Sequence, residues 1–274
     1  MYKIFDAHTH IYPEKIAEKA IVNLGNFYNY IPQCKGVPED LEENCRSGGV
    51  GGFLLLTVAT NAHQVQKINE YAAQSVKKAK EDGFVCRGFA GMHQDLPDGE
   101  KEAELDRCIE MGLSGVKLHP DFQMIDIDDE RLFPLYEMVS ERGLPVCFHM
   151  GDERPQYRYS EPRKLRHVLE LFPKMRAVAA HFGGYKAWDE SEELLSGFNG
   201  QGRLMFDTSS SLLNLTPERA VELINSLGED NMMFGTDYPS LNAAGELERF
   251  MRLKLSDSVR EKIFWNNASR FLNF

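Results

Sequence analysis

The feature that most constrains the fold of this chain is a repeat of short apolar segments separated by longer amphipathic ones. From the second onward, the apolar segments begin 27 to 32 residues apart. One strand, one helix and two short loops need about 30 residues. We expect eight strands, at Lys3–His8, Phe53–Val58, Phe84–Ala90, Gly115–His119, Leu144–His149, Arg176–His181, Arg203–Thr208 and Met232–Asp237.

The segments between these strands have apolar residues at helical spacing, and they end before a glycine or a proline. Thr216 followed by Pro217 is a typical helix start. The expected strands are too apolar to have one face in water, as in a parallel sheet covered by helices. We expect helices within Asn61–Asp82, Gly99–Met111, Asp129–Arg142, Glu161–Phe172 and Pro217–Leu227.

Strict alternation of strands and helices is compatible with an open, doubly wound sheet or a closed barrel. Eight units in 274 residues favour the α/β class and a (β/α)₈ TIM barrel that forms one domain, residues 1–274. The first expected strand is not followed by G-x-G-x-x-G, which weakens the dinucleotide-binding alternative.

The interval between the first two strands is about 20 residues longer than one repeat needs. We place the extra chain at about Gly25–Pro38, which carries Phe27, Tyr28 and Tyr30. Because this insertion follows the first strand, it should lie at the mouth of a barrel, where active sites form. It is either a packed surface loop or an aromatic lid or wall for a substrate.

The charge and cysteine content exclude several classes of partner. The net charge is −11, which disfavours nucleic acids and anionic membranes as partners. The sequence has no run of about 18 apolar residues and no apolar signal-peptide core. Five cysteines without C-x-x-C indicate reduced thiols. We expect a cytoplasmic protein with a small-molecule substrate, and a homo-oligomer stays open.

Five of the eight histidines lie at or just after the ends of expected strands, and two aspartates occupy similar positions. His8 and His10 are two residues apart, so both imidazoles can face one metal ion. Imidazole and carboxylate groups bind Zn²⁺ and similar ions. Asp207 either lines the pocket or forms hydrogen bonds in the core. The residues at strand ends are His8, His10, His119, His149, His181, Asp207 and Asp237.

Motifs along nearly the whole chain resemble the amidohydrolase superfamily. They also resemble its amidohydrolase-related branch, which includes aminocarboxymuconate-semialdehyde decarboxylase and similar decarboxylases and hydrolases. The matching motifs are Asp6-Ala7-His8-Thr9-His10, Gly115-Val116-Lys117-Leu118-His119-Pro120, Pro145-Val146-Cys147-Phe148-His149-Met150-Gly151, Ala179-Ala180-His181-Phe182-Gly183-Gly184, Phe234-Gly235-Thr236-Asp237-Tyr238-Pro239 and Asn267-Ala268-Ser269-Arg270-Phe271.

This resemblance implies a role for each matching residue. His8, His10, His149 and Asp237 would bind one divalent metal, which we expect to be Zn²⁺. Asp237 would also orient or deprotonate a water molecule. His181 would be catalytic, contacting the water or the substrate.

The lysine in the fourth strand leaves the number of metal ions open. In two-metal members of the superfamily, a lysine at this place is carbamylated and bridges both ions, and Lys117 lies near that place. The one-metal alternative leaves Lys117 as an ammonium group in the barrel. His119 shares a face with Lys117, so it either lines the pocket or caps the following loop.

Three further residues have weaker claims to a role in the site. Arg154 and Arg158 follow the fifth strand and either hold a substrate carboxylate or are solvated loop charges. Trp188 either walls the pocket or packs against the fold.

Our leading prediction is a hydrolase in which a metal-activated water attacks an amide, ester or lactone carbonyl. In this reading Asp237 takes the proton and His181 stabilises the oxyanion. The alternative is a nonoxidative decarboxylase with the same site. A third possibility is a noncatalytic metal-binding or scaffold barrel.

Overall fold

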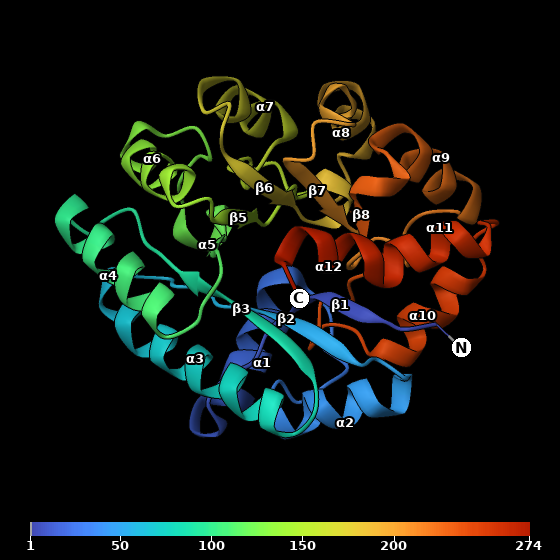
Figure 1. Ribbon diagram of the computed structural model, residues 1–274, viewed down its shortest axis with the longest axis horizontal. Helices are drawn as coiled ribbons and strands as arrows, with labels where there is room; N and C mark the ends of the chain where they lie inside the picture. Colours follow the sequence, from blue (N-terminus) through green and yellow to red (C-terminus); the bar gives the residue numbers. More distant parts are fainter. Residues whose placement is uncertain (1) are drawn as a thin grey trace.

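The computed structural model describes residues 2–274 as a barrel of eight parallel strands in sequential order, surrounded by helices (Figure 1). A bridge between Thr9 and Tyr238, and a hydrogen bond of 2.8 Å from the Ala7 amide to the Phe234 carbonyl, join the first strand to the residues that directly follow the last strand. The strands are β1 (Phe5–Thr9), β2 (Gly52–Leu56), β3 (Val85–Gly91), β4 (Val116–Leu118), β5 (Pro145–Phe148), β6 (Arg176–Ala179), β7 (Leu204–Asp207) and β8 (Met232–Met233).

The helices follow the expected alternation, with short 3₁₀ and π turns between some of them. All five expected helices are present. They are α3, α4, α6, α7 and α9 in the series α1 (Glu14–Tyr28), α2 (Pro38–Gly48), α3 (Val65–Glu81), α4 (Asp98–Glu110), α5 (Pro120–Gln123), α6 (Phe133–Glu141), α7 (Pro162–Leu171), α8 (Trp188–Leu195), α9 (Pro217–Leu227), α10 (Ala243–Met251), α11 (Asp257–Glu261) and α12 (Asn267–Leu272).

The TIM barrel expected from the repeat is confirmed, and the largest difference is the length of the last strand. We expected Met232–Asp237, but β8 ends at Met233. The residues that follow stay bonded to β1 without forming a regular strand, and Asp237 has a positive φ of 64°. A residue in this region of backbone space cannot continue a strand. The early end of β8 therefore places Asp237 at the barrel mouth instead of in the sheet.

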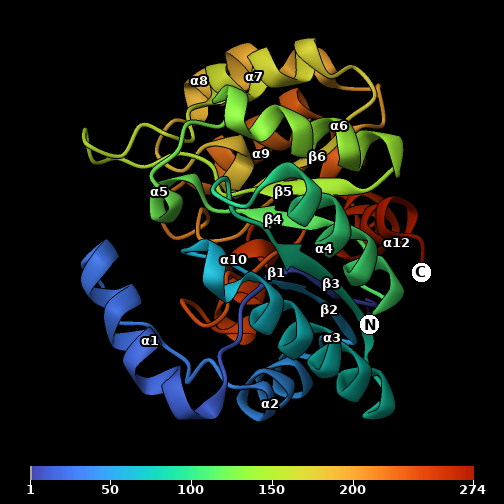
Figure 2. The same cartoon turned by 90° about the vertical axis from the view of Figure 1, so that its left-hand side faces the viewer.

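The core has two layers. One cluster lies between the strands and the outer helices. A second cluster lies inside the barrel and includes Phe5, Ala7, Leu54 and Cys147. Phe271 and other residues of α12 pack against this inner cluster, and both chain termini lie at the same end of the barrel (Figure 2). The opposite end is left for the side chains that follow the strands.

The pairing of β1 with β2 becomes irregular around His8, near the end of the first strand. The register shifts between Asp6 and Thr9. The Asp6 carboxylate accepts hydrogen bonds from the His8 amide at 3.1 Å, from the Thr236 amide at 3.0 Å and from the Thr236 hydroxyl at 2.6 Å. Asp6 thus ties the irregular end of β1 to the residue that precedes Asp237.

The long connection between β1 and β2 is mostly helical. Helix α1 extends to Tyr28, so the segment predicted as the insertion, Gly25–Pro38, begins within its last turn. Residues 29–37 are irregular, and α2 then leads to β2. Figure 2 shows α1 standing out from the barrel on the side where α5 also lies. Tyr28 is consequently presented at the barrel mouth.

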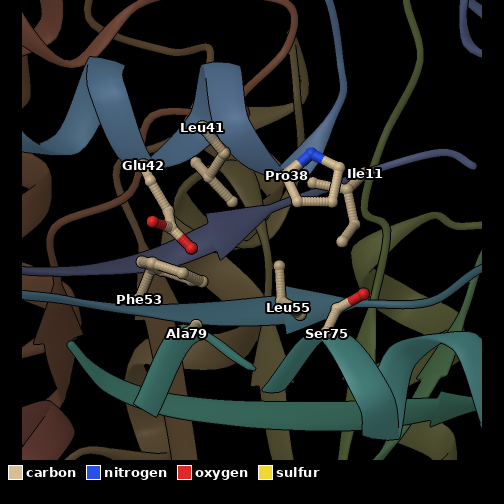
Figure 3. Close-up of a pocket in the computed structure, with 8 residues that line it drawn as sticks. All are labelled: Ile11, Pro38, Leu41, Glu42, Phe53, Leu55, Ser75 and Ala79. Atoms are coloured by element: carbon tan, nitrogen blue, oxygen red, sulfur yellow. The ribbon is translucent and has the colours of Figure 1, made fainter. Parts of the chain in front are cut away.

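A small cavity lies outside the barrel, against the outer side of β2 (Figure 3). Leu41 of α2, Leu55 of β2 and Ala79 of α3 are among its lining residues. Its volume of about 10 Å³ has room for roughly one water molecule. This cavity is a gap in the packing, separate from the histidines.

None of the helices described in residues 2–274 is both long enough and apolar enough to cross a membrane.

Candidate active site

Five histidines form a continuous row at the carboxyl ends of the strands. Neighbouring ring centres are 5.0 Å apart for His10 and His8, 5.0 Å for His8 and His181, 4.8 Å for His181 and His149, and 4.0 Å for His149 and His119. They come from the ends of β1, β6, β5 and β4, so residues far apart in the chain meet at one place.

The pair His8 and His10 has the geometry of two metal ligands. Their Nε2 atoms are 3.1 Å apart. The Nδ1 atom of His8 lies 2.9 Å from an Asp207 oxygen, and that of His10 lies 2.8 Å from the Leu56 carbonyl oxygen. Each Nδ1 therefore carries the proton of a neutral ring. The two facing Nε2 atoms then carry no proton, and each presents a lone pair.

A carboxylate completes this group. One Asp237 oxygen lies 3.6 Å from the Nε2 atoms of both His8 and His10. Burial, together with the nearby positive charge of Lys117, holds the pKa of His10 well below its usual value. A neutral ring keeps its lone pair for a metal. Two lone pairs and a carboxylate oxygen facing one point fit a divalent cation.

His149 and His181 form the other half of the row. The His149 Nδ1 lies 3.0 Å from the His181 Nε2, and the His181 Nδ1 donates to the Ser209 carbonyl at 3.0 Å. Burial lowers the pKa of His181 to about 4. His149 thus contacts His181 directly, and His181 lies between His149 and the group formed by His8, His10 and Asp237. Its role as a fourth ligand stays a prediction.

The Asp237 side chain is fixed by its backbone and by a serine. Its amide donates to the His8 carbonyl at 3.0 Å, and one carboxylate oxygen accepts from the Ser210 hydroxyl. The side chains of Asp237 and His10 are 18% and 16% exposed, whereas His8 and His181 are almost fully buried. Solvent, and hence a substrate, reaches the row from the side of His10 and Asp237.

Asp207, whose role the sequence left open, forms hydrogen bonds in the core beneath the row. Its side chain is fully buried and contacts His8. Burial alone would raise the pKa of Asp207, but the hydrogen bonds from His8 and Ser209 oppose it, and the pKa lies below its usual value. Asp207 is therefore ionised in the folded protein.

Lys117 extends into the barrel interior near the row. It is almost fully buried, and its Nζ donates to the Cys147 sulfur at 3.6 Å. Its positive charge contributes to the lowered pKa values of His10, His149 and His181. Carbamylation of Lys117 remains a prediction.

His119 both caps the following helix and lines the row. It is the N-cap of α5, and its ring stacks between Phe122 at 3.8 Å and His149 at 4.0 Å. The Tyr28 hydroxyl lies 3.0 Å from the His119 Nε2 and 3.4 Å from the His149 Nε2. The end of α1 therefore covers this side of the site.

Asp121 follows His119 closely, and the sequence pattern gave no sign of a role for it. It is buried, and one of its oxygens lies 3.5 Å from the His149 Nε2 and 3.1 Å from the Ser160 hydroxyl. Burial raises the pKa of Asp121 to about 7. Ser209 and Ser210 were also missed, and the serine run after Asp207 was their signal in the sequence.

The two arginines predicted as weak substrate contacts differ in environment. Arg154 pairs with Asp152 at 2.6 Å and stacks on aromatic rings, so protein groups occupy it. Arg158 is 66% exposed and pairs with Glu161 at 2.9 Å, as a solvated loop charge does. The Trp188 indole donates to the His181 carbonyl at 3.1 Å.

Comparison with known proteins identifies the family. A family model described as Amidohydrolase matches residues 5–274, so the chain belongs to the amidohydrolase family. 2-Amino-3-carboxymuconate-6-semialdehyde decarboxylase of Dictyostelium discoideum is 27% identical over 246 residues, which cover 76% of this chain and 66% of that protein. Gamma-resorcylate decarboxylase of Polaromonas sp. strain JS666 is 22% identical over 259 residues, which cover 77% and 76%.

A solved structure supports the same fold. It is 5-carboxyvanillate decarboxylase of Novosphingobium aromaticivorans, complexed with manganese and 4-hydroxy-3-methoxy-5-nitrobenzoic acid. It aligns with a TM-score of 0.75 and 14% identity over 100% of this chain and 96% of that one. At this identity the likeness establishes the barrel fold alone.

Proposed function

We propose that this protein is a metal-dependent, nonoxidative decarboxylase of a small aromatic or unsaturated carboxylic acid. The observation that carries the metal dependence is the pair of facing Nε2 lone pairs on His8 and His10 beside the Asp237 carboxylate. Both curated relatives described above are decarboxylases, which favours this alternative over the hydrolase that we expected first.

His8, His10 and Asp237 would hold the divalent cation, with His149 as the fourth ligand. The manganese in the related decarboxylase structure favours Mn²⁺ at least as much as the Zn²⁺ that we expected. A bound cation would supply charge that orients and polarises the substrate. The protein's own side chains would bind the substrate and transfer the proton.

The reaction replaces one carbon–carbon bond with a carbon–hydrogen bond. The bond to the carboxylate breaks, carbon dioxide leaves, and the electron pair left on the carbon takes up a proton. We assign to Asp237 and His181 the relay of that proton from solvent water to the carbon. In the one-metal alternative, the buried ammonium of Lys117 would give the pocket a positive charge that suits an anionic substrate.

The test is a product assay on protein stripped of metal and then reloaded with Mn²⁺ or Zn²⁺. A panel of hydroxybenzoates and unsaturated acids is screened for carbon dioxide, and a panel of esters, amides and lactones is screened for acid release. We expect carbon dioxide to form with metal present, and one deuterium to appear on the product carbon in D₂O. Acid release without carbon dioxide would overturn the proposal in favour of hydrolysis.

A further inference from the structure

One buried carboxylate contacts both halves of the candidate site. Asp207, at the end of β7, accepts from the His8 Nδ1 at 2.9 Å through one oxygen. Its other oxygen accepts from the His181 amide at 3.0 Å and from the Ser209 amide at 3.1 Å, and also from the Ser209 hydroxyl. Four donors thus converge on two oxygens that water does not reach.

The contact with His8 decides which nitrogen of that ring carries the proton. An ionised carboxylate can only accept, so the His8 Nδ1 must donate to it. The proton is then absent from Nε2, which faces the His10 Nε2 at 3.1 Å. A lone pair at this position is what a metal ion requires of an imidazole.

The contacts with the other oxygen hold the backbone around His181. His181 has a positive φ of 60°, and so does the next residue, Phe182, at 55°. Both residues have a backbone conformation that is rare for residues other than glycine and that persists only when surrounding contacts enforce it. Asp207 binds the His181 amide directly and fixes Ser209, whose carbonyl accepts from the His181 Nδ1. The His181 Nε2 is thereby turned toward His149.

We propose that Asp207 is a positioning residue that sets the tautomer of His8 and the orientation of His181 at the same time. This inference rests on the proposed function, because the His8 lone pair has a role only if it binds the proposed metal ion. The role depends on the two acceptor oxygens of the Asp207 carboxylate. It can therefore be tested with a side chain of the same shape that has one acceptor.

An asparagine at position 207 keeps the shape but has a single acceptor oxygen and an NH₂ group. If its oxygen faces the His181 and Ser209 amides, its NH₂ points at the His8 Nδ1. That nitrogen must then accept, and the proton moves to Nε2. In the reverse orientation the NH₂ meets two backbone N–H groups and leaves them without an acceptor, so the first orientation is favoured.

The experiment measures the tautomer of His8 in metal-free protein labelled with ¹⁵N-histidine, by long-range ¹H–¹⁵N NMR at pH 7.5. The His8 signals are those that disappear in His8→Ala. We expect the Nδ1–H form in the wild type and the Nε2–H form in Asp207→Asn. Glu104→Gln is the control, because Glu104 is also buried and paired, with Arg107 and Asn69, but lies on α4. It should leave His8 unchanged.

The second readout is Mn²⁺ affinity, measured by competition with a chelator. Asp207→Asn should bind Mn²⁺ about 10- to 100-fold more weakly than the wild type. Glu104→Gln should bind Mn²⁺ with the affinity of the wild type. An Nε2–H form of His8 in the wild type would overturn the inference even if the variant fails to fold. An unchanged tautomer in folded Asp207→Asn would also overturn it. A wild type that binds no metal would refute the proposed function, while the NMR result still decides the role of Asp207.

Discussion

The guanidinium of Arg154 lies 4.4 Å from the centre of the Phe27 ring and donates a hydrogen bond to the Phe27 carbonyl. It also stacks on Tyr28 at 5.2 Å and Tyr157 at 4.1 Å, and it pairs with Asp152. The loop after β5 is thus fastened to the end of α1. This link fixes Tyr28 above His119.

Replacing this arginine should loosen the covering of the site. Arg154→Ala removes the cation–π contacts and the bond to the Phe27 carbonyl. We expect faster hydrogen exchange in residues 25–37 and a higher KM for the substrate, with a folded barrel. Arg158→Ala is the matched control, because Arg158 is exposed and pairs only with Glu161 among the residues described. Equal exchange in the two variants would contradict the role of Arg154.

The metal content of the protein should depend on His8 and His10, at the carboxyl end of β1. We expect about one divalent ion per chain in protein purified without chelator, and near zero in His8→Ala or His10→Ala. His63→Ala, at an exposed histidine, should keep the ion. Elemental analysis measures each value. About two ions in the wild type would favour a carbamylated Lys117, and an unchanged content in both β1 variants would refute this site.

The Asp237 carboxylate should be required for turnover. We expect Asp237→Asn to lower kcat by about 10²- to 10⁴-fold, the usual contribution of an acid–base group. The metal content is measured alongside, since Asp237 also faces His8 and His10. Asp230→Asn, at an exposed carboxylate paired with Lys262, should keep full activity. Unchanged turnover by Asp237→Asn with metal bound would show that the proton comes from elsewhere.

The turn after β5 should tolerate no side chain at Gly151. This residue has a φ of 76°, and an added Cβ would lie 2.4 Å from the Tyr185 backbone nitrogen. We expect Gly151→Ala to lower the free energy of unfolding by about 3 kcal/mol or more. Gly143 has a φ of 65° but open space around it, so Gly143→Ala should cost about 1 kcal/mol. Urea unfolding compares the two, and equal losses would rule out the backbone clash.

A buried glutamate on α10 should make stability depend on pH. Burial raises the pKa of Glu246 to about 7, against the opposing effect of Arg249. Between about pH 4.5 and pH 7 the folded state holds a proton that the unfolded state has lost, so this group makes stability fall as pH rises. Glu246→Gln removes that dependence.

Relative to Glu246→Gln, the wild type should lose about 1 to 3 kcal/mol between pH 5 and pH 7, since one pKa unit is worth about 1.4 kcal/mol. Urea unfolding at several pH values measures the difference. Glu248→Gln, at an exposed position on the same helix, should follow the wild type. A constant difference between wild type and Glu246→Gln across this range would contradict the raised pKa.

The spacing of the apolar segments was sufficient to predict the barrel, because each strand–helix unit has a nearly fixed length. The position of His8 and His10 at a strand end was visible for the same reason. The hydrogen-bond acceptors were harder to predict. Whether Asp207 or Asp121 contacts a histidine depends on which strands are neighbours and on how the loop after each strand turns at the barrel mouth. Likewise, spacing alone did not show that α1 would continue to Tyr28.

The bond between the Trp188 indole and the His181 carbonyl gives the site an intrinsic optical reporter. The chain has two tryptophans, and Trp265 packs near Phe5 and Phe274, away from the barrel mouth. In a Trp265→Phe background, the emission would come from a single indole held at the backbone of His181. Binding of a metal or a carboxylic acid could then be followed by fluorescence, without a label and before any substrate is identified.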